Sequence, residues 1–161
     1  MENEACSDTG PILHLKEINK IELLKIFNKL FISTQIKEEL QKYNIKDLPN
    51  NIKLHEINKD QVTLIAEKYN LDIGESSIIY LSKSLKIPII LTDDLYAREV
   101  SKSLDLKPVG TIGIILRNYR EKLTTKEKTI QNLKQLHKNS TLFVTADLIK
   151  YAINEVNKYK F

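Results

Sequence analysis

Short β-like runs alternate with helical patterns along this chain, and this alternation is the feature that most narrows its fold. Strands separated by helices pair in parallel, because the chain must cross back over the sheet between them. The clearest candidate is Pro88–Thr92, an apolar run that begins at a proline and is followed by two aspartates. The other candidates are Ala5–Asp8, Leu30–Ser33, Lys53–Ile57 and Lys107–Val109. The sequence therefore predicts a three-layer α/β/α fold with a central parallel sheet of about five strands.

Helical patterns fill the gaps between these runs. We expect helices over Ile18–Asn28, Thr34–Tyr43 (with Thr34 as its N-cap), Asp60–Tyr69, Glu75–Leu85, Asp94–Leu104 and Thr111–Arg120. The last third of the chain contains two amphipathic helices, Thr125–His137 and Ala146–Tyr159. In the second, Ile149, Ala152, Ile153 and Val156 form an apolar stripe that suits packing or a dimer contact. Since no repeat and no Pro/Gly-rich linker interrupts the sequence, we expect residues 1–161 to form one domain, with a core over about 5–120 and a helical extension over about 124–161.

Composition excludes several classes of protein. The chain has 161 residues, of which 42% are hydrophobic and 29% are charged, as in an ordinary globular domain. No apolar run reaches the roughly 20 residues of a membrane helix, and the first residues show neither a basic nor an apolar signal segment. Cys6 is the only cysteine, so we expect a small buried strand residue in a cytoplasmic protein rather than a disulfide or a zinc site. The net charge of +4 permits binding to a polyanion without requiring it.

Acidic residues close two of the predicted strands. Asp8 ends the first strand, before the turn-like Thr9-Gly10-Pro11, and Asp93 and Asp94 follow Thr92. In open parallel sheets, ligands bind beyond the carboxyl ends of the strands, near the point where the strand order reverses. A single aspartate in such a place is ordinarily the N-cap of the next helix. Two strands that end in this way, one of them with paired aspartates, favour a binding site instead.

Two glutamates join this group by helical geometry. Because successive residues turn by about 100° in a helix, Glu39 lies at the edge of the inward stripe of Thr34–Tyr43 while Glu38 points away. Glu75 shares a face with Ile78, in the middle of the buried side of its helix. A glutamate in a first turn also complements the helix dipole, which explains an acid at this position but not its direction towards the core.

Carboxylates that converge at a buried strand edge repel one another unless a cation compensates them. The nearest basic side chain within these motifs is Arg98, one turn beyond Asp94. Oxygen ligands without cysteine or histidine suit Mg²⁺ or Mn²⁺, and one or two such ions can activate water and stabilise an in-line attack on a phosphodiester. Lysines and arginines outside the pocket would then hold the substrate backbone.

The same motifs, in the same order, resemble those of the PIN-domain nucleases, particularly the prokaryotic, VapC-like subgroup with Gly-Glu and doubled-Asp motifs. They are Asp8–Ile12, Ile36–Leu40, Gly74–Ser76, Leu91–Arg98 and Val109–Gly113. The resemblance implies a Rossmann-like sheet and an endoribonuclease that cleaves single-stranded RNA with Mg²⁺ or Mn²⁺. Carried over by motif, the catalytic acids are Asp8, Glu39, Glu75, Asp93 and Asp94, and the metal ligands are Asp8, Glu75, Asp93 and Asp94, with Asp8 central.

The resemblance also implies supporting roles and partners. Thr9 and Thr92 would position water or a carboxylate through their hydroxyls, although each is also an ordinary turn or strand-end residue, and Arg98 would support the site. Many relatives are toxins of toxin–antitoxin pairs. The expected partners are therefore RNA, a small antitoxin protein and a second copy of the chain, with no membrane.

Two other functions are compatible with parts of this pattern. One is a PIN-like module that binds RNA or protein without cutting, which the presence of every motif acid disfavours. The other is a phosphoacceptor receiver-like domain, which needs a lysine at a strand end, whereas Lys107 stands at a strand start. The three histidines belong to no nucleophilic motif: His55 falls in a β-like run, His14 in a first helical turn region, and for His137 we expect an ordinary core or helix-end role.

Overall fold

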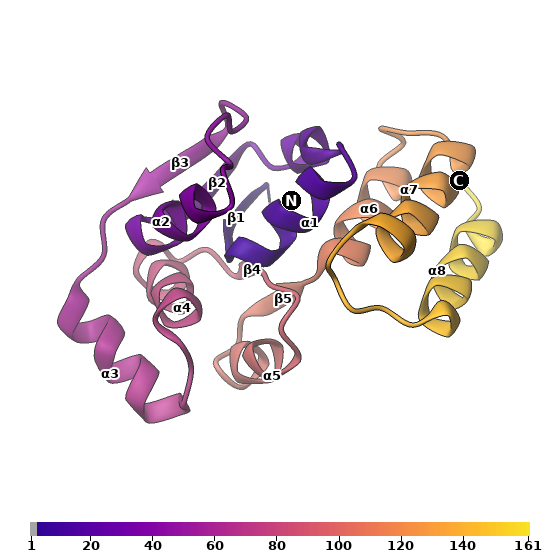
Figure 1. The fold of residues 1–161 in the computed structure, drawn as a ribbon. Helices are drawn as coiled ribbons and strands as arrows, with labels where there is room; N and C mark the ends of the chain where they lie inside the picture. The colour runs from indigo at the N-terminus through magenta and orange to yellow at the C-terminus, as the bar shows by residue number, and fades with distance from the viewer. Residues whose placement is uncertain (1–2) are drawn as a thin grey trace.

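Five parallel strands form the centre of the protein in the computed structural model, which describes residues 3–161 (Figure 1). Met1 and Glu2, which belong to the segment that predicts no secretion signal, lie outside the described residues. The strands are β1 (Glu4–Ser7), β2 (Lys29–Ser33), β3 (Ile52–His55), β4 (Ile89–Leu91) and β5 (Lys107–Val109), in the order β3-β2-β1-β4-β5. The predicted α/β fold with five parallel strands is therefore confirmed.

The strand order reverses between β1 and β4. From β1 the chain moves outwards through β2 to β3, whereas from β4 it moves in the opposite direction to β5. Cys6 pairs with Ile90, and the pairing continues beyond the strands because Asp8 N–H donates to Leu91 O at 2.9 Å. The carboxyl ends of these two neighbouring strands therefore meet at the switch point, where open α/β sheets bind ligands.

Helices enclose the sheet and give the three layers expected from the sequence. They are α1 (Thr9–Glu17), the 3₁₀ helix η1 (Ile21–Ile26), α2 (Thr34–Lys42), α3 (Lys59–Tyr69), α4 (Ile73–Leu85), α5 (Leu95–Ser103), α6 (Thr111–Arg120), α7 (Lys126–Asn139) and α8 (Ala146–Lys158). The helix α4 packs on β1, β2 and β4, and both α5 and α6 pack on β5. None of the helices within residues 3–161 combines the length and the hydrophobicity that crossing a bilayer requires.

The segment after β1 differs from the prediction. Thr9-Gly10-Pro11 is the first turn of α1 rather than a turn, and the helix expected over Ile18–Asn28 is only the short η1. Proline is tolerated in a first helical turn because the N–H groups there have no partner within the helix. Asn19, in the left-handed region with φ 57°, then separates α1 from η1.

Helix caps account for the smaller differences in boundaries. Ser33, not Thr34, caps α2, because its Oγ accepts from Ile36 N at 3.0 Å. The helix α4 begins two residues earlier than expected, at a capping box in which Asp72 and Glu75 each accept from the backbone N–H of the other. The cap side chain thus decides where each of these helices starts.

The two C-terminal helices pack on the rest of the chain through α6, beside which they lie in Figure 1. Their apolar stripes, which include Leu133, Leu136, Ile149, Ala152 and Val156, are buried in the same hydrophobic cluster as the sheet residues. Cys6 lies in this core as well, and burial raises the pKa of its thiol to about 11. The expected packing role of the stripes and the buried position of Cys6 are confirmed.

Candidate active site

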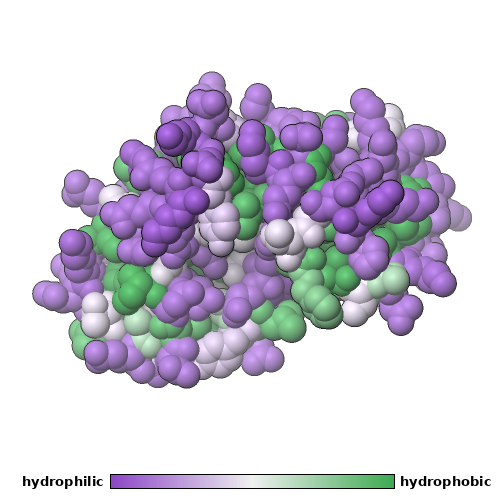
Figure 2. All heavy atoms as spheres, viewed as in Figure 1, coloured by the Kyte–Doolittle hydropathy of each residue, from purple (hydrophilic) through white to green (hydrophobic). Residues whose placement is uncertain are grey.

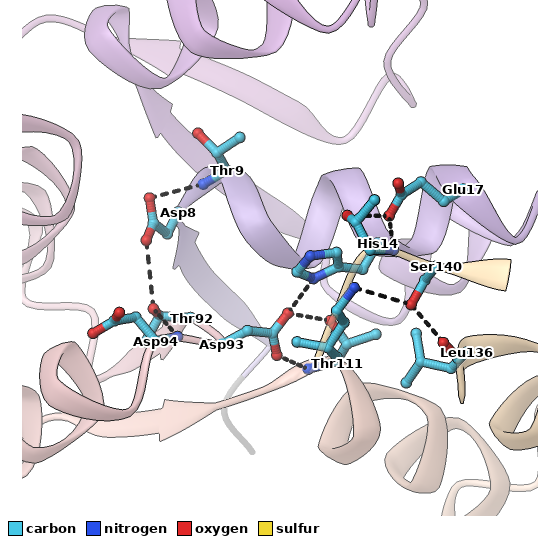
Figure 3. A network of polar contacts seen from close by, with 12 residues as sticks. Asp8, Thr9, His14, Glu17, Thr92, Asp93, Asp94, Thr111, Leu136 and Ser140 are labelled. Atoms are coloured by element: carbon cyan, nitrogen blue, oxygen red, sulfur yellow. Dashed lines mark hydrogen bonds and ion pairs between the residues drawn. The ribbon is translucent and has the colours of Figure 1, made fainter. Parts of the chain in front are cut away.

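Asp8 and Thr92 face each other at the ends of β1 and β4 (Figure 3). Asp8 is the N-cap of α1, where its Oδ1 accepts from Thr9 N at 2.8 Å. Its Oδ2 accepts from the Thr92 hydroxyl at 3.4 Å. Thr92 is held in turn by the sheet, since its N–H donates to Val109 O at 3.0 Å. The switch point therefore presents a carboxylate whose direction is set by the two strand ends.

Glu39 reaches the same place from α2. The Thr9 hydroxyl donates to Glu39 Oε2 in a short hydrogen bond. On the other side lies Gly74, where an added Cβ would sit 2.6 Å from Glu39 Oε1 and 3.1 Å from Oε2. Only a residue without a side chain leaves room for this carboxylate, so the Gly74-Glu75 pair positions Glu39 as well as Glu75.

Glu75 belongs to the capping box at the start of α4 and lies partly buried beside Asp72. Burial raises the pKa of Glu75 to about 7, with further contributions from the negative charges of Asp72, Asp94 and Glu39 and an opposing one from its hydrogen bond to the Asp72 backbone. An acid in a first helical turn ordinarily complements the positive end of the helix dipole, and Glu75 is placed to do so in α4. Its charge nevertheless belongs to a group of five carboxylates, whose other members are Asp8, Glu39, Asp72 and Asp94.

Asp8 is the second member of this group with a raised pKa. Burial raises the pKa of its carboxyl to about 7, and the charges of Glu75, Asp72 and Glu39 raise it further, while the hydrogen bond from Thr9 lowers it. Such a carboxylate is costly in its ionised form unless a cation stands next to it. The site therefore favours a bound cation or a bound proton at Asp8.

Asp93 and Asp94 point in different directions (Figure 3). Asp94 caps α5 through a 2.8 Å hydrogen bond from Ala97 N, and its charge acts on Glu75. Asp93 accepts from the backbone N–H and the hydroxyl of Thr111, at 2.7 and 2.6 Å, and its Oδ2 also lies 2.7 Å from His14 Nδ1. The structure thus places Asp94 with the acid group and Asp93 against α1 and α6.

Arg98 approaches the site next to Asp93. A Cβ added to Gly110 would lie 2.9 Å from both Arg98 Nη1 and Asp93 Oδ1. Gly110 precedes Thr111 and caps α6, so both polar side chains converge on the start of that helix. Arg98 is therefore close to Asp93, rather than inside the group formed by Asp8, Glu39 and Glu75.

Three residues for which the sequence predicts no site role, Asp72, His14 and Thr111, lie at the site in the structure. Asp72 could have been found from the Asp-x-x-Glu spacing of a capping box with Glu75. His14 follows Asp8 by six residues on α1, a helix that was not expected. Thr111 lies within the motif Val109–Gly113, but its contact with Asp93 depends on the docking of α6.

Three of the acids, Asp8, Glu39 and Asp72, line a cavity of about 740 Å³. Its other lining residues include Thr9, His14, Lys42, Tyr43 and Thr141. Lys42 and the exposed Tyr43 supply a cation and an aromatic ring at its border. A cavity of this composition can admit an anionic chain with flat bases.

The donor atoms of the acid group fit a hard divalent cation, because they are all carboxylate oxygens in mutual repulsion. In the described residues 3–161, however, no three His, Cys, Asp or Glu side chains converge tightly enough to enclose an ion in their present rotamers. A bound ion would thus require side-chain rotations of Asp8 and its neighbours. The residues that could supply ligands are Asp8, Glu39, Asp72, Glu75 and Asp94.

Comparison with known proteins gives two findings. A protein-family profile described as a PIN domain matches residues 4–158. The crystal structure of PAE2754 from Pyrobaculum aerophilum is similar in fold, with 14% sequence identity and a TM-score of 0.52 over 73% of this chain and 90% of that chain. At this identity the likeness concerns the fold alone. A search among curated proteins gives no match.

Proposed function

Since the chain belongs to the PIN-domain family, whose members are generally nucleases, we propose that it is a metal-dependent endoribonuclease that hydrolyses the phosphodiester bonds of single-stranded RNA. The observation that carries the proposal is Asp8. It ends the central strand at the switch point, and burial and three neighbouring acids raise its pKa to about 7. An uncompensated carboxylate of this kind is a suitable central ligand for a divalent ion.

The proposed ligands are Asp8, Glu75 and Asp94, with Glu39 completing the catalytic acids and Mg²⁺ or Mn²⁺, as one or two ions, as the cofactor. When bound, the metal would lower the pKa of a coordinated water and neutralise the phosphate. Of the paired aspartates, the hydrogen bonds favour Asp94 as the direct ligand. Asp93 is proposed as a residue that positions the site, since Thr111 and His14 already occupy its carboxylate.

The remaining side chains orient these acids and the substrate. The hydroxyls of Thr92 and Thr9 donate to Asp8 and Glu39, which fixes both carboxylates relative to the sheet edge. A general base must lie within hydrogen-bond reach of the attacking water, and Glu39 and Glu75 border the space where that water would bind. Arg98 is placed to contact a phosphate on the Asp93 side of the site.

Several finer features belong to the same proposal. We propose that residues 1–161 act as a single PIN-like domain, because α7 and α8 share the hydrophobic cluster of the sheet. We also propose a cytoplasmic protein of the VapC-like subgroup that works on RNA as the toxin of a toxin–antitoxin pair, with a small antitoxin and a second copy of the chain as partners. The support is the set of motifs that these residues share with that subgroup.

A non-catalytic PIN-like module that binds RNA or protein is the second candidate. One observation favours it: within residues 3–161, no three acidic side chains enclose an ion in their present rotamers. Under this alternative the raised pKa of Asp8 would be met by a bound proton rather than by a metal. Only the activity of the protein separates the two candidates.

The test is cleavage of a labelled single-stranded RNA with Mn²⁺, with Mg²⁺ and with EDTA. Cleavage that needs the metal and is lost in Asp8→Asn supports the nuclease. Asp60→Asn, an exposed aspartate on α3, is the matched control and should cut like the unchanged chain. RNA binding without cutting under every condition, with the fold intact by circular dichroism, would support the non-catalytic module.

A further inference from the structure

A second cavity, of about 620 Å³, borders Asp93 but not Asp8. Its walls come from α5, β5, α6, the connection between α7 and α8, and the start of α8. Most of the lining is apolar and includes Ile112, Leu116, Val144 and Leu148. In Figure 2, hydrophobic surface is visible where this connection passes below α6 in Figure 1, as it is in other parts of the same face. The cavity therefore offers an apolar surface next to the proposed active site.

Residues 140–145 connect α7 to α8 and are called the strap; side-chain contacts anchor this segment at two places. Glu17 Oε1 accepts from both the N–H and the hydroxyl of Thr141, each at 2.9 Å. Val144 O lies 3.1 Å from His137 Nδ1. Between these two anchors, Phe143 is 90% exposed. A large aromatic ring is thus exposed at the edge of the cavity on an anchored segment, where a ligand in the cavity could cover its apolar surface.

The charge around this cavity is mainly positive. Three arginines, Arg98, Arg117 and Arg120, line it, and among the described lining residues Asp93 is the only acid. Arg117 binds Glu121 at 2.6 Å and lies over the Phe27 ring, so its guanidinium is already engaged. Arg98 and the exposed Arg120 are better placed to meet an anion.

The two cavities adjoin each other. His14 lines the cavity of the acids and Asp93 lines the second one, and these side chains are 2.7 Å apart. The strap also borders both, with Thr141 on one side and Phe143 on the other. A flexible ligand that reaches the acids can therefore extend along the strap into the second cavity.

We propose that the second cavity is a base-binding subsite for single-stranded RNA. An unstacked base packs against Phe143 and Leu148, and Arg98 and Arg120 contact the flanking phosphates. The ligand must join flat apolar groups to regularly spaced negative charges and continue into the acid cavity, and an unpaired RNA strand has all three properties. The inference rests on the proposed nuclease function for the position of the cleaved phosphate.

The experiment measures RNA affinity without cutting. The full chain carrying Asp8→Asn is titrated into a short fluorescein-labelled RNA in Mg²⁺, and fluorescence anisotropy gives the Kd. Adding Phe143→Ala should raise the Kd about tenfold, as expected for the loss of one stacked base. Tyr151→Ala, which removes an exposed ring on α8 outside the cavity, is the control and should leave the Kd unchanged.

A set of RNAs with one abasic nucleotide at successive positions then identifies the contact. For one position of the abasic nucleotide, the chain with Phe143 should lose as much affinity for the RNA as Phe143→Ala loses for the intact RNA. With that same abasic RNA, Phe143→Ala should cause no further loss of affinity. Equal weakening of intact and abasic RNA by Phe143→Ala would overturn the proposal.

The same experiments separate this inference from the proposed function. Suppose that Phe143→Ala leaves the Kd unchanged while the chain with Asp8 intact cleaves RNA with metal. This result would overturn the subsite but not the nuclease proposal, and it would favour a protein partner as the ligand of the cavity. If the chain neither binds nor cuts RNA, the nuclease proposal fails, and the subsite fails with it.

Discussion

His14 Nδ1 lies 2.7 Å from Asp93 Oδ2, and this contact keeps the two aspartates after β4 in different surroundings. Asp93 is held between His14 on α1 and Thr111 at the start of α6. Asp94 remains beside Glu75, whose pKa it helps to raise. The two neighbouring aspartates therefore have different roles. Asp93 connects α1 and α6 beside the site, and Asp94 adds negative charge to the acid group.

Metal affinity should separate the two aspartates. Asp94→Asn is expected to weaken Mn²⁺ binding on the order of 100-fold, because it removes one of the three proposed ligands. Asp93→Asn should weaken it by less than about threefold, because the Asp93 carboxylate contacts Thr111 and His14 rather than any of the proposed ligands. Isothermal titration calorimetry of the RNA-free chain gives both affinities. Equal losses in the two variants would mean that Asp93 also binds the ion.

Gly74→Ala should lower activity without unfolding the protein. The added Cβ would lie 2.6 Å from Glu39 Oε1, so this carboxylate must swing away from its place beside Thr9. Alanine is the better helix former in α4, and the free energy of unfolding should change by less than about 1 kcal/mol. Cleavage should fall about tenfold or more at saturating Mn²⁺.

Gly10→Ala is the matched control for that variant, because its Cβ would make only ordinary contacts, the nearest at 3.5 Å from His14 Cε1. A Gly74→Ala chain with full activity would show that the position of Glu39 is not critical.

Much of the fold could be predicted because its signals are local. Each of the five strands lies within one or two residues of its expected ends, and Thr111–Arg120 is a helix with the expected boundaries. Helical periodicity also separates Glu39, which is partly buried, from the exposed Glu38. Asp8 and Asp94 could be placed near each other because parallel strands end at one edge of a sheet.

The rest depended on caps and on tertiary packing. Gly10 and Pro11 suggest a turn, but the Asp8 cap allows a helix to start there, and that helix carries His14. No local pattern predicts that Asp93 turns towards Thr111, because the contact requires α6 to dock across the sheet end.

The strap should loosen when its anchor on α1 is removed. Glu17→Gln leaves one oxygen that can accept from Thr141, whereas Glu17→Ala removes both hydrogen bonds. Because the two bonds are exposed, we expect Glu17→Ala to lower the free energy of unfolding by only about 1 kcal/mol. Hydrogen exchange of residues 140–145 should nevertheless become clearly faster in Glu17→Ala than in Glu17→Gln. Unchanged exchange in both variants would show that the strap is held by other contacts.

The stability of the metal-free chain should depend on pH through Asp8 and Glu75. In the unfolded chain these carboxyls titrate at their ordinary values of 3.8 and 4.5, whereas the folded protein raises both pKa values to about 7. The folded state therefore binds more protons between these limits. Its free energy of unfolding should fall as the pH rises from about 4 to about 7 and then level off.

Asp8→Asn should remove about half of this pH dependence, because Glu75 keeps a pKa raised by its own burial and by Asp72, Asp94 and Glu39. The neutral amide cannot repel Glu75 or Glu39, so in EDTA at pH 8 the variant should be more stable than the unchanged chain by roughly 2 kcal/mol, and the difference should shrink towards pH 4. Urea denaturation at both pH values measures this, with Asp60→Asn as the control. At pH 8, Mn²⁺ should stabilise the unchanged chain more than Asp8→Asn, because ion binding adds stability only where the ligand is present. A metal-free chain that gains stability from pH 4 to pH 7 would contradict the electrostatic conflict at Asp8 on which the proposed metal site depends.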